Sequence, residues 1–262
     1  VDHHGRLEPG RMFLVNMDEG RIIEDSEIKN EVVGKKPYRK WLDENLLELK
    51  DVPYTGNKTP VEKEDFETRL RLFGYTQEDL KTIINPMSSS AKESIGSMGT
   101  DTPLAVLSER PQLLYNYFKQ LFAQVTNPPL DGIREEIVTD TSLSIGSDHN
   151  IFEVVPEQCK KLRIQNPVIS NEDLDKIKYI EHSDYKAVSI GTLYAVEKGH
   201  NGLESALDQM VVDIEKAVDE GANILILSDR GVSSENAPIP MLLACSHAHH
   251  GLKKLKKRSS FG

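Results

Sequence analysis

The feature that most constrains the fold is a short apolar run that begins after Asn223 and ends at Leu227. Four apolar residues in a row are too few for a free-standing helix, and the run ends in the polar sequence Ser228–Gly231. Continuous apolar runs of this length are typical of strands that are buried on both faces of a sheet. The sequence therefore predicts a central parallel strand over residues 223–227.

The segments on either side of this run predict a strand–helix–strand unit. Apolar residues between Leu203 and Val218 recur at helical spacing, and Gly221 is placed to end that helix. Upstream, Lys186–Val196 is a second run rich in strand-forming residues, and downstream Met241–Leu255 has the pattern of another helix. A strand, a helix and a strand in this order pair in parallel, which predicts an α/β fold.

The polar residues at the end of the run are candidates for a functional site. In α/β sheets, ligands bind at the carboxyl ends of parallel strands. We therefore expect any ligand to lie near Ser228, Asp229 and Arg230.

Composition excludes several classes of protein. The 262 residues are 38% hydrophobic and carry a formal net charge of −10, which argues against a nucleic-acid partner. The sequence lacks the roughly 20 consecutive apolar residues of a membrane helix, so we expect a soluble protein. The two cysteines, Cys159 and Cys245, do not form a CxxC pair, and no targeting peptide is evident at Val1. These features predict a reducing, cytoplasmic location.

The N-terminal part of the chain predicts small, separate elements. Arg11–Ile23 has the pattern of a hairpin with a glycine-bearing turn, and two short helices should follow, over Glu27–Val33 and from Pro37 through Trp41. Asp25 or Ser26 is expected to cap the first helix. Because a lone hairpin is marginally stable in water, we expect its remaining sheet to lie outside this sequence.

The middle of the chain predicts a linker, helices and a loop. Leu49–Pro60 lacks periodicity and is interpreted as a linker, and helices are expected over Val61–Phe73 and Gln77–Ile84. Their acidic composition disfavours a helix-turn-helix reader of DNA. Ser88–Thr102 should be a connecting loop, since it lacks the GxxxxGK[ST] order of a phosphate loop. Pro111–Val125 predicts a helix with an apolar stripe that faces a core.

Long stretches of the sequence resemble one protein family. The segment from Glu93 to Val138 closely resembles the central domain of the glutamate synthase large subunit. The stretches that carry this resemblance are Ile95–Asp101, Ala105–Ser108, Tyr117–Pro129 and Ile133–Val138. Gly5–Met12 through Trp41–Asn45 resembles the end of that family's glutamine amidotransferase domain, and Asn223–Gly231 with Pro238–Pro240 resembles a later signature of the central domain.

The resemblance implies a domain division and a role. Residues 1–48 would be the tail of the amidotransferase domain and a linker, and residues 49–262 the central domain, with a fold that resembles a rudimentary, partial flavin-type barrel. In that family, ammonia from glutamine passes through a tunnel to an FMN and iron–sulfur centre, where it is joined to 2-oxoglutarate. The implied role of this chain is to connect the two sites and help to wall the tunnel.

The resemblance also implies cofactors and partners outside this chain. FMN and the iron–sulfur cluster would be bound elsewhere in the parent enzyme, so this chain alone should bind no cofactor and be inactive. Its partners would be the amidotransferase and FMN-binding domains of the same parent chain, with a small reductase subunit as a further candidate. Five residues are candidate contacts to other domains or remnants of a site: Ser97, Asp101, Ser228, Asp229 and Arg230.

Three further clusters are interpreted as structural. His247 and His250 share a helix face but have no carboxylate or cysteine beside them at helical spacing, so a metal site is disfavoured. Asp229 and Arg230 could be an acid with its charge partner, but they fit a turn that faces a neighbouring domain better. The basic run from Lys253 to Arg258 suits a solvated helix end.

An alternative function stays open at this point. The polar strand end at Ser228–Gly231 could serve an independent small-molecule-binding α/β module. Against a flavin phosphate at this place, Pro238 and Pro240 offer no N–H donors and Glu235 adds repulsive charge.

Overall fold

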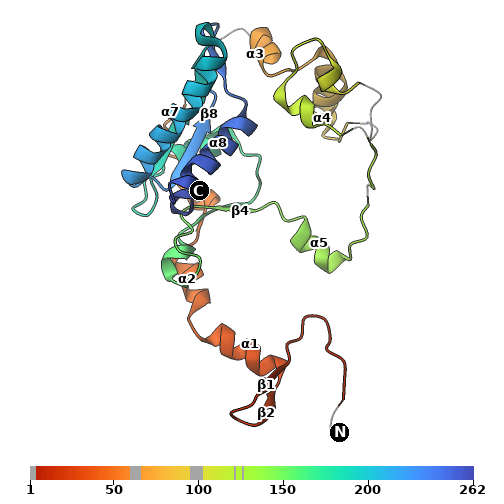
Figure 1. The fold of residues 1–262 in the computed structure, drawn as a ribbon, viewed down its shortest axis with the longest axis vertical. Coiled ribbons are helices and arrows are strands. Elements are labelled where there is room, and N and C mark those ends of the chain that lie inside the picture. Colours follow the sequence, from red (N-terminus) through yellow and green to blue (C-terminus); the bar gives the residue numbers. More distant parts are fainter. Residues whose placement is uncertain (1–3, 60–65, 95–102, 121, 126) are drawn as a thin grey trace.

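The structure is a computed structural model that describes residues 4–59, 66–94, 103–120, 122–125 and 127–262. Its α-helices are α1 (Asp25–Gly34), α2 (Tyr38–Asn45), α3 (Phe66–Leu72), α4 (Asn85–Ser90), α5 (Gly132–Val138), α6 (Asn171–Lys178), α7 (Gly199–Asp219) and α8 (Met241–Lys254). Its strands are β1 (Leu14–Asn16), β2 (Arg21–Ile23), β3 (Leu47–Glu48), β4 (Leu143–Ile145), β5 (Leu162–Ile164), β6 (Ala187–Gly191), β7 (Leu193–Ala195), β8 (Ile224–Ser228) and β9 (Asn236–Pro238). Figure 1 shows an α/β body built around α7, α8 and β8, with α1 and the β1–β2 hairpin extending away from it.

The predicted strand–helix–strand unit is confirmed. β6 and β8 pair in parallel, from Ala187 opposite Ile224 to Gly191 opposite Ser228, and α7 connects them. Gly221 follows α7 with a φ of +91°, a conformation that glycine adopts without steric cost. The predicted second strand is divided at Thr192 into β6 and β7, because β7 leaves β6 and pairs antiparallel with β9.

β8 is buried on both faces, as its apolar run predicts. Leu225 and Leu227 pack against the core beneath α7 and α8, while Ile224 and Ile226 pack against a second core on the opposite face. The alternation follows from the strand itself, in which successive side chains point to opposite faces.

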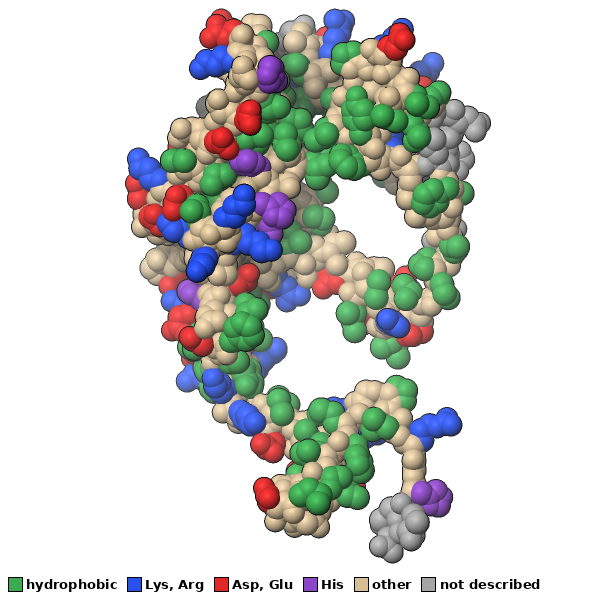
Figure 2. All heavy atoms as spheres, in the orientation of Figure 1, with side chains coloured by type: hydrophobic (Ala, Val, Ile, Leu, Met, Phe, Trp, Pro, Cys, Tyr) green, Lys and Arg blue, Asp and Glu red, His purple; other side chains and the backbone are tan. Residues whose placement is uncertain are grey.

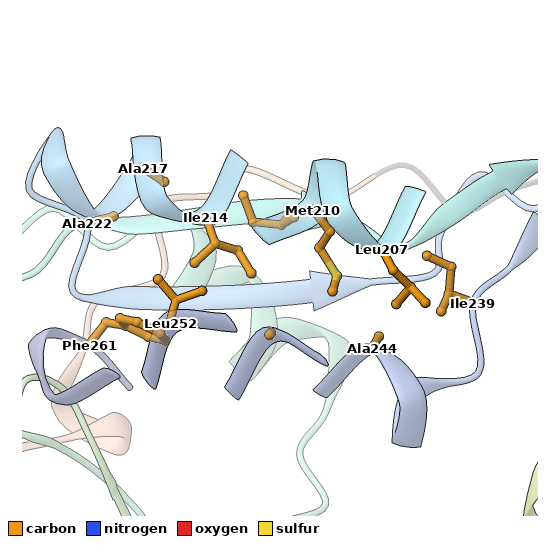
Figure 3. Close-up of a cluster of buried hydrophobic side chains, with 11 residues drawn as sticks. Leu207, Met210, Ile214, Ala217, Ala222, Ile239, Ala244, Leu252 and Phe261 are labelled. Carbon is orange, nitrogen blue, oxygen red and sulfur yellow. The ribbon is translucent and has the colours of Figure 1, made fainter. Parts of the chain in front are cut away.

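The first core lies between β8 and the two long helices. In Figure 3, side chains of α7 and α8 meet around the strand. Met210, Ile214 and Leu252 are at most 2% exposed. Burial of such side chains is the main stabilising contribution to the body.

A three-stranded sheet, which the sequence did not predict, supports the second core. β5 lies in its middle, parallel to β3 and antiparallel to β4. Leu49 and Val52 are both buried in this core, so the interpretation of Leu49–Pro60 as a linker is wrong for its first four residues. These side chains are apolar and follow directly after β3, which holds them against β5.

The N-terminal segment contains the predicted hairpin and helices. β1 and β2 form a two-stranded sheet of their own, and α1 and α2 follow. Asp25 does not cap α1 as predicted: it is the first helical residue, and its carboxylate accepts a hydrogen bond from the Met12 N–H (2.9 Å). Figure 2 shows hydrophobic side chains gathered on this hairpin. Phe13, which precedes β1, is exposed.

The middle of the chain differs most from prediction. The predicted helix Pro111–Val125 is wrong: of its described residues, only Leu114–Phe118 is helical, as a short 3-10 helix, and Phe118 is 70% exposed. The expected loop from Ser88 begins later, because Ser88–Ser90 belongs to α4. The predicted helix over Val61–Phe73 is present as α3 in its described part, and Asp79–Ile84 forms a π-helix that continues into α4.

The structure confirms the predicted α/β class, in the form of several small sheets covered by helices. None of the helices in the described part of the chain is long and apolar enough to cross a membrane.

Candidate functional site at the carboxyl end of β8

Ser228, Asp229 and Arg230 lie where β8 ends, as predicted. The Ser228 carbonyl accepts a hydrogen bond from the Thr192 N–H (2.8 Å), and the Ser228 hydroxyl accepts one from the Arg230 N–H (3.3 Å). Gly231 then turns the chain with a φ of +96°. These residues therefore form a tight turn at the start of the loop between β8 and β9.

Arg230 connects this turn to a neighbouring helix. Its Nη2 donates to the Oδ1 of Asn171 (3.0 Å), the first residue of α6. The guanidinium therefore reaches α6 and not the adjacent Asp229. This geometry fits the interpretation of Asp229 and Arg230 as turn residues better than that of a catalytic acid with its charge partner.

A second pair of strands covers the end of β8. β7 and β9 pair antiparallel directly beyond it, and the Ile239 N–H donates to the Thr192 carbonyl (2.8 Å). Described residues line cavities beside β3, beside α8, beneath β8 and at the hairpin, and none of these four is lined by Ser228, Asp229 or Arg230. The turn therefore lines none of these four cavities.

Two carboxylates on α6, the helix that Arg230 contacts, are held ionised. Asp175 is 6% exposed and accepts hydrogen bonds from Thr59, which lower the pKa of its carboxyl group, and the nearby charges of Lys178 and Arg230 lower it further. The Ser170 hydroxyl donates to Asp173 (2.9 Å) and, with Lys176, lowers the pKa of that carboxyl group. Both carboxylates are occupied by protein partners and serve to fix α6.

The remaining candidates are placed as follows. Ser97 and Asp101 lie outside the described residues. His247 lies 3.4 Å from the Asp208 carboxylate, and His249 accepts a hydrogen bond from Arg258 (3.2 Å). Within the part of the chain that the structure describes, no group of three His, Cys, Asp or Glu side chains could hold a metal ion.

The basic run after α8 is partly structural. The Lys257 ammonium contacts Glu215 (2.8 Å) and Asp219 (2.7 Å) of α7, and these partners raise its pKa. Arg258 donates to the Phe261 carbonyl (2.9 Å). The interpretation of the whole run as solvated is therefore wrong for these two residues, which fasten the C-terminal segment to α7 and to itself.

Three residues that organise this region were not predictable from the sequence. Asn171 holds Arg230, while Thr59 and Asp175 join segments far apart in the chain. Of the elements that hold these residues, only α6 has a sequence pattern that could have predicted it, because Ser170 and Asp173 have the spacing of an N-terminal helix cap.

Comparisons with known proteins agree with this organisation. Residues 68–262 match the family described as glutamate synthase central domain, and residues 1–41 match class-II glutamine amidotransferases. The chain is 42% identical to the glutamate synthase [NADPH] large chain of Bacillus subtilis over 96% of its own length. It is 39% identical to the glutamate synthase [NADH] of Schizosaccharomyces pombe over 97%, and 38% identical to the chloroplastic ferredoxin-dependent glutamate synthase of Spinacia oleracea over 96%.

An α/β body preceded by a hairpin and two helices thus corresponds to a central domain preceded by part of an amidotransferase domain. The chain belongs to the glutamate synthase family. It spans 13–16% of the length of the three relatives named above.

Proposed function

We propose that this chain is the central connecting part of a glutamate synthase, and that it links the glutamine-hydrolysing domain to the FMN-containing synthase domain. The observation that carries the proposal is that one chain matches both families, and that its amidotransferase-like segment packs directly on the α/β body. α2 contacts the 3-10 helix Pro156–Cys159, and β3 follows two residues later and pairs with β5. The amidotransferase-like segment therefore joins the body through a short, structured connection.

The hairpin supports a docking role for this segment. Among the described residues its sheet has two strands, and Phe13, Leu14 and Ile22 are all more than 40% exposed. Apolar surface of this kind is normally covered by protein. We assign it to the remainder of the amidotransferase domain, which would place the glutaminase site at the hairpin end of α1.

The chain would serve the parent reaction by holding the two catalytic sites in position, and not by catalysing a step itself. The reaction converts glutamine, 2-oxoglutarate and a reductant to two glutamates, and ammonia must cross from one site to the other. A body that fixes the distance between the sites and helps to wall the tunnel prevents loss of ammonia to water. The partial resemblance of the body to a flavin-type barrel, and the domain boundary between residues 48 and 49, are parts of this proposal.

The cofactors of the parent enzyme would be bound outside this chain. Iron–sulfur clusters are held mainly by cysteine thiolates, and the two cysteines of the chain are too few for a cluster. FMN would supply the electrons for the reductive step from its own domain. The relatives whose names contain NADPH, NADH and ferredoxin are about equally identical in sequence to this chain. The sequence of this chain therefore does not indicate which electron donor the parent enzyme uses, or whether a reductase subunit binds to it. A cytoplasmic location likewise stays part of the proposal.

An insertion in the full-length enzyme tests the connecting role. Four Gly/Ser residues between Gly34 and Lys35 would separate the hairpin and α1 from α2 and the body. We expect glutamine hydrolysis to continue while the glutamate formed per glutamine hydrolysed falls and free ammonia appears. The matched control is the same insertion between Gly56 and Asn57, in an exposed loop whose two ends, at Val52 and Thr59, are anchored on the body. Unchanged coupling in both variants would contradict the proposal.

The alternative, an independent small-molecule-binding module at Ser228–Gly231, has no observation in its favour. Arg230 is engaged by Asn171, and β7 and β9 cover the strand end.

A further inference from the structure

The outer edge of β8 has backbone groups that the rest of the described chain does not pair. Successive residues of a strand direct their N–H and C=O groups to opposite edges. Ile224 donates its N–H to the Lys186 carbonyl, and the Ser228 carbonyl accepts from Thr192, so the backbone N–H and C=O groups of the even-numbered residues of β8 point toward β6. The backbone groups of Leu225 and Leu227 therefore point to the opposite edge.

Gly262 already occupies the beginning of that edge. Its N–H donates to the Asn223 carbonyl (3.0 Å), and its carbonyl accepts from the Leu225 N–H (3.0 Å). This reciprocal pair around Ile224 is the hydrogen-bond pattern of a parallel ladder. Beyond it, the Leu225 carbonyl and the Leu227 N–H have no hydrogen-bond partner among the described residues.

A cavity lies on each face of this edge. On the α8 side, a cavity of about 660 Å³ is lined by Leu225, Leu227, Met241, Phe261 and Gly262, among others. On the opposite side, a cavity of about 440 Å³ is lined by Ile145, Ile164, Ile226 and, again, Leu225 and Gly262. An extended chain along the edge would place alternate side chains in the two cavities.

We propose that this edge is the docking site of a third parallel strand, formed by the residues that directly follow Gly262 in the full-length polypeptide. Gly262 is in register with Ile224 and runs parallel to β8, so the chain that continues from it passes Leu225, Ile226 and Leu227 in turn. The cavity linings predict apolar side chains at all three positions. β8 then becomes a central strand along its whole length, with β6 on one side and the new strand on the other.

The close packing of Gly262 fixes the starting point of this strand. A Cβ atom at this position would lie 2.4 Å from the Gly146 nitrogen and 2.6 Å from the Ile145 Cγ2. Any larger residue must displace the chain at this position from Ile145 and Gly146, and with it the start of the proposed strand. Gly191 of β6 provides a control in the same sheet, because a Cβ atom there meets nothing within 4 Å.

Amide hydrogen exchange, resolved to single residues, tests the proposal. It is measured in the polypeptide 1–262 and in the full-length enzyme. The Leu227 N–H should exchange at least about tenfold more slowly in the full-length enzyme, while the Ile226 N–H, which faces β6, should be slow in both. Equally fast exchange of Leu227 in both proteins would overturn the proposal. Protection of Leu227 that appears in the polypeptide 1–262 only at high concentration would also overturn it, since a second copy would then occupy the edge.

Two variants of the full-length enzyme complete the test. Gly262→Ala should restore fast exchange of the Leu227 N–H, and Gly191→Ala should leave it protected. Slow exchange of the Ile226 N–H shows that each variant remains folded. Continued protection of Leu227 in folded Gly262→Ala would contradict the proposed register.

Discussion

Asp175, in the middle of α6, and Thr59 are 116 positions apart in the chain and are joined by hydrogen bonds. The Asp175 carboxylate accepts hydrogen bonds from the backbone N–H (3.2 Å) and the hydroxyl of Thr59. Lys178 also donates to the Thr59 hydroxyl (3.3 Å). The segment after Val52 is therefore held on the body at its far end as well as at its beginning.

This contact predicts a pH-dependent contribution to stability. The folded state lowers the pKa of Asp175, so its contribution is present above the unfolded pKa and is lost as the pH falls through the folded pKa. Asp175→Asn should lower the free energy of unfolding by about 1–3 kcal/mol near neutral pH. The difference from wild type should shrink below about pH 4. Urea unfolding at a series of pH values measures it.

The control for this prediction is Asp51→Asn, which changes an exposed aspartate near the same core. Its difference from wild type should be small at every pH. A difference for Asp175→Asn that is independent of pH would show that the Asp175 charge does not stabilise the fold.

The core beneath α8 predicts a large effect of truncation. Leu252 is 0% exposed and packs among α7, α8 and β8, so Leu252→Ala should destabilise the chain by about 2–5 kcal/mol. Leu242 of the same helix is 44% exposed, and Leu242→Ala should change stability by less than about 0.5 kcal/mol. The denaturant midpoints of the two variants are compared. Equal midpoints would contradict the assignment of Leu252 to the core.

The elements that the sequence predicted correctly are those with long local patterns. α7 repeats its apolar spacing over several turns, and the run to Leu227 is buried on both faces, so these patterns reflect contacts that the elements make. β3 and β5 are two and three residues long and pair across more than 100 residues of sequence, so neither has a local pattern that could predict it.

The predicted helix Pro111–Val125 shows why spacing alone is insufficient. Its apolar residues have helical spacing, but Tyr117 and Phe118 are exposed, and neither belongs to the two core clusters of the described residues. Helices of this length depend on tertiary packing for stability. The segment instead contacts the rest of the protein at single points, such as the Tyr115 hydroxyl, which accepts from the Leu242 N–H (3.3 Å).

The candidate site was predictable in position but not in contacts. Strand order places Ser228, Asp229 and Arg230 at a carboxyl end, whereas the Arg230 to Asn171 contact depends on α6, for which the sequence made no prediction. Ser97 and Asp101 remain predictions.

We expect the turn at Ser228–Gly231 to bind no FMN. Titration of the polypeptide 1–262 with FMN, followed by flavin fluorescence, should show no saturable binding at micromolar concentrations. Arg230→Ala should leave the titration unchanged and should affect only the contact with α6. Saturable binding that is lost in Arg230→Ala would show that this turn is a ligand site.

We also expect the polypeptide 1–262 to release no ammonia from glutamine. Amide hydrolysis needs an activated nucleophile next to a general base. Cys159 and Cys245 are the only thiols in the sequence, and both are free cysteines in the structure. A coupled assay for ammonia measures the rate. Release that survives repurification and disappears in Cys159→Ala or Cys245→Ala would give this chain a catalytic role of its own.

Isotope transfer in the full-length enzyme tests the connecting role most directly. The enzyme receives glutamine labelled with ¹⁵N in the amide, 2-oxoglutarate, its electron donor and an excess of unlabelled ammonium. We predict that the new glutamate keeps the label in wild type and in the Gly56/Asn57 insertion, and that the label is diluted by bulk ammonium in the Gly34/Lys35 insertion. Undiluted label in the Gly34/Lys35 insertion would contradict the view that this chain holds the two sites in a fixed relation.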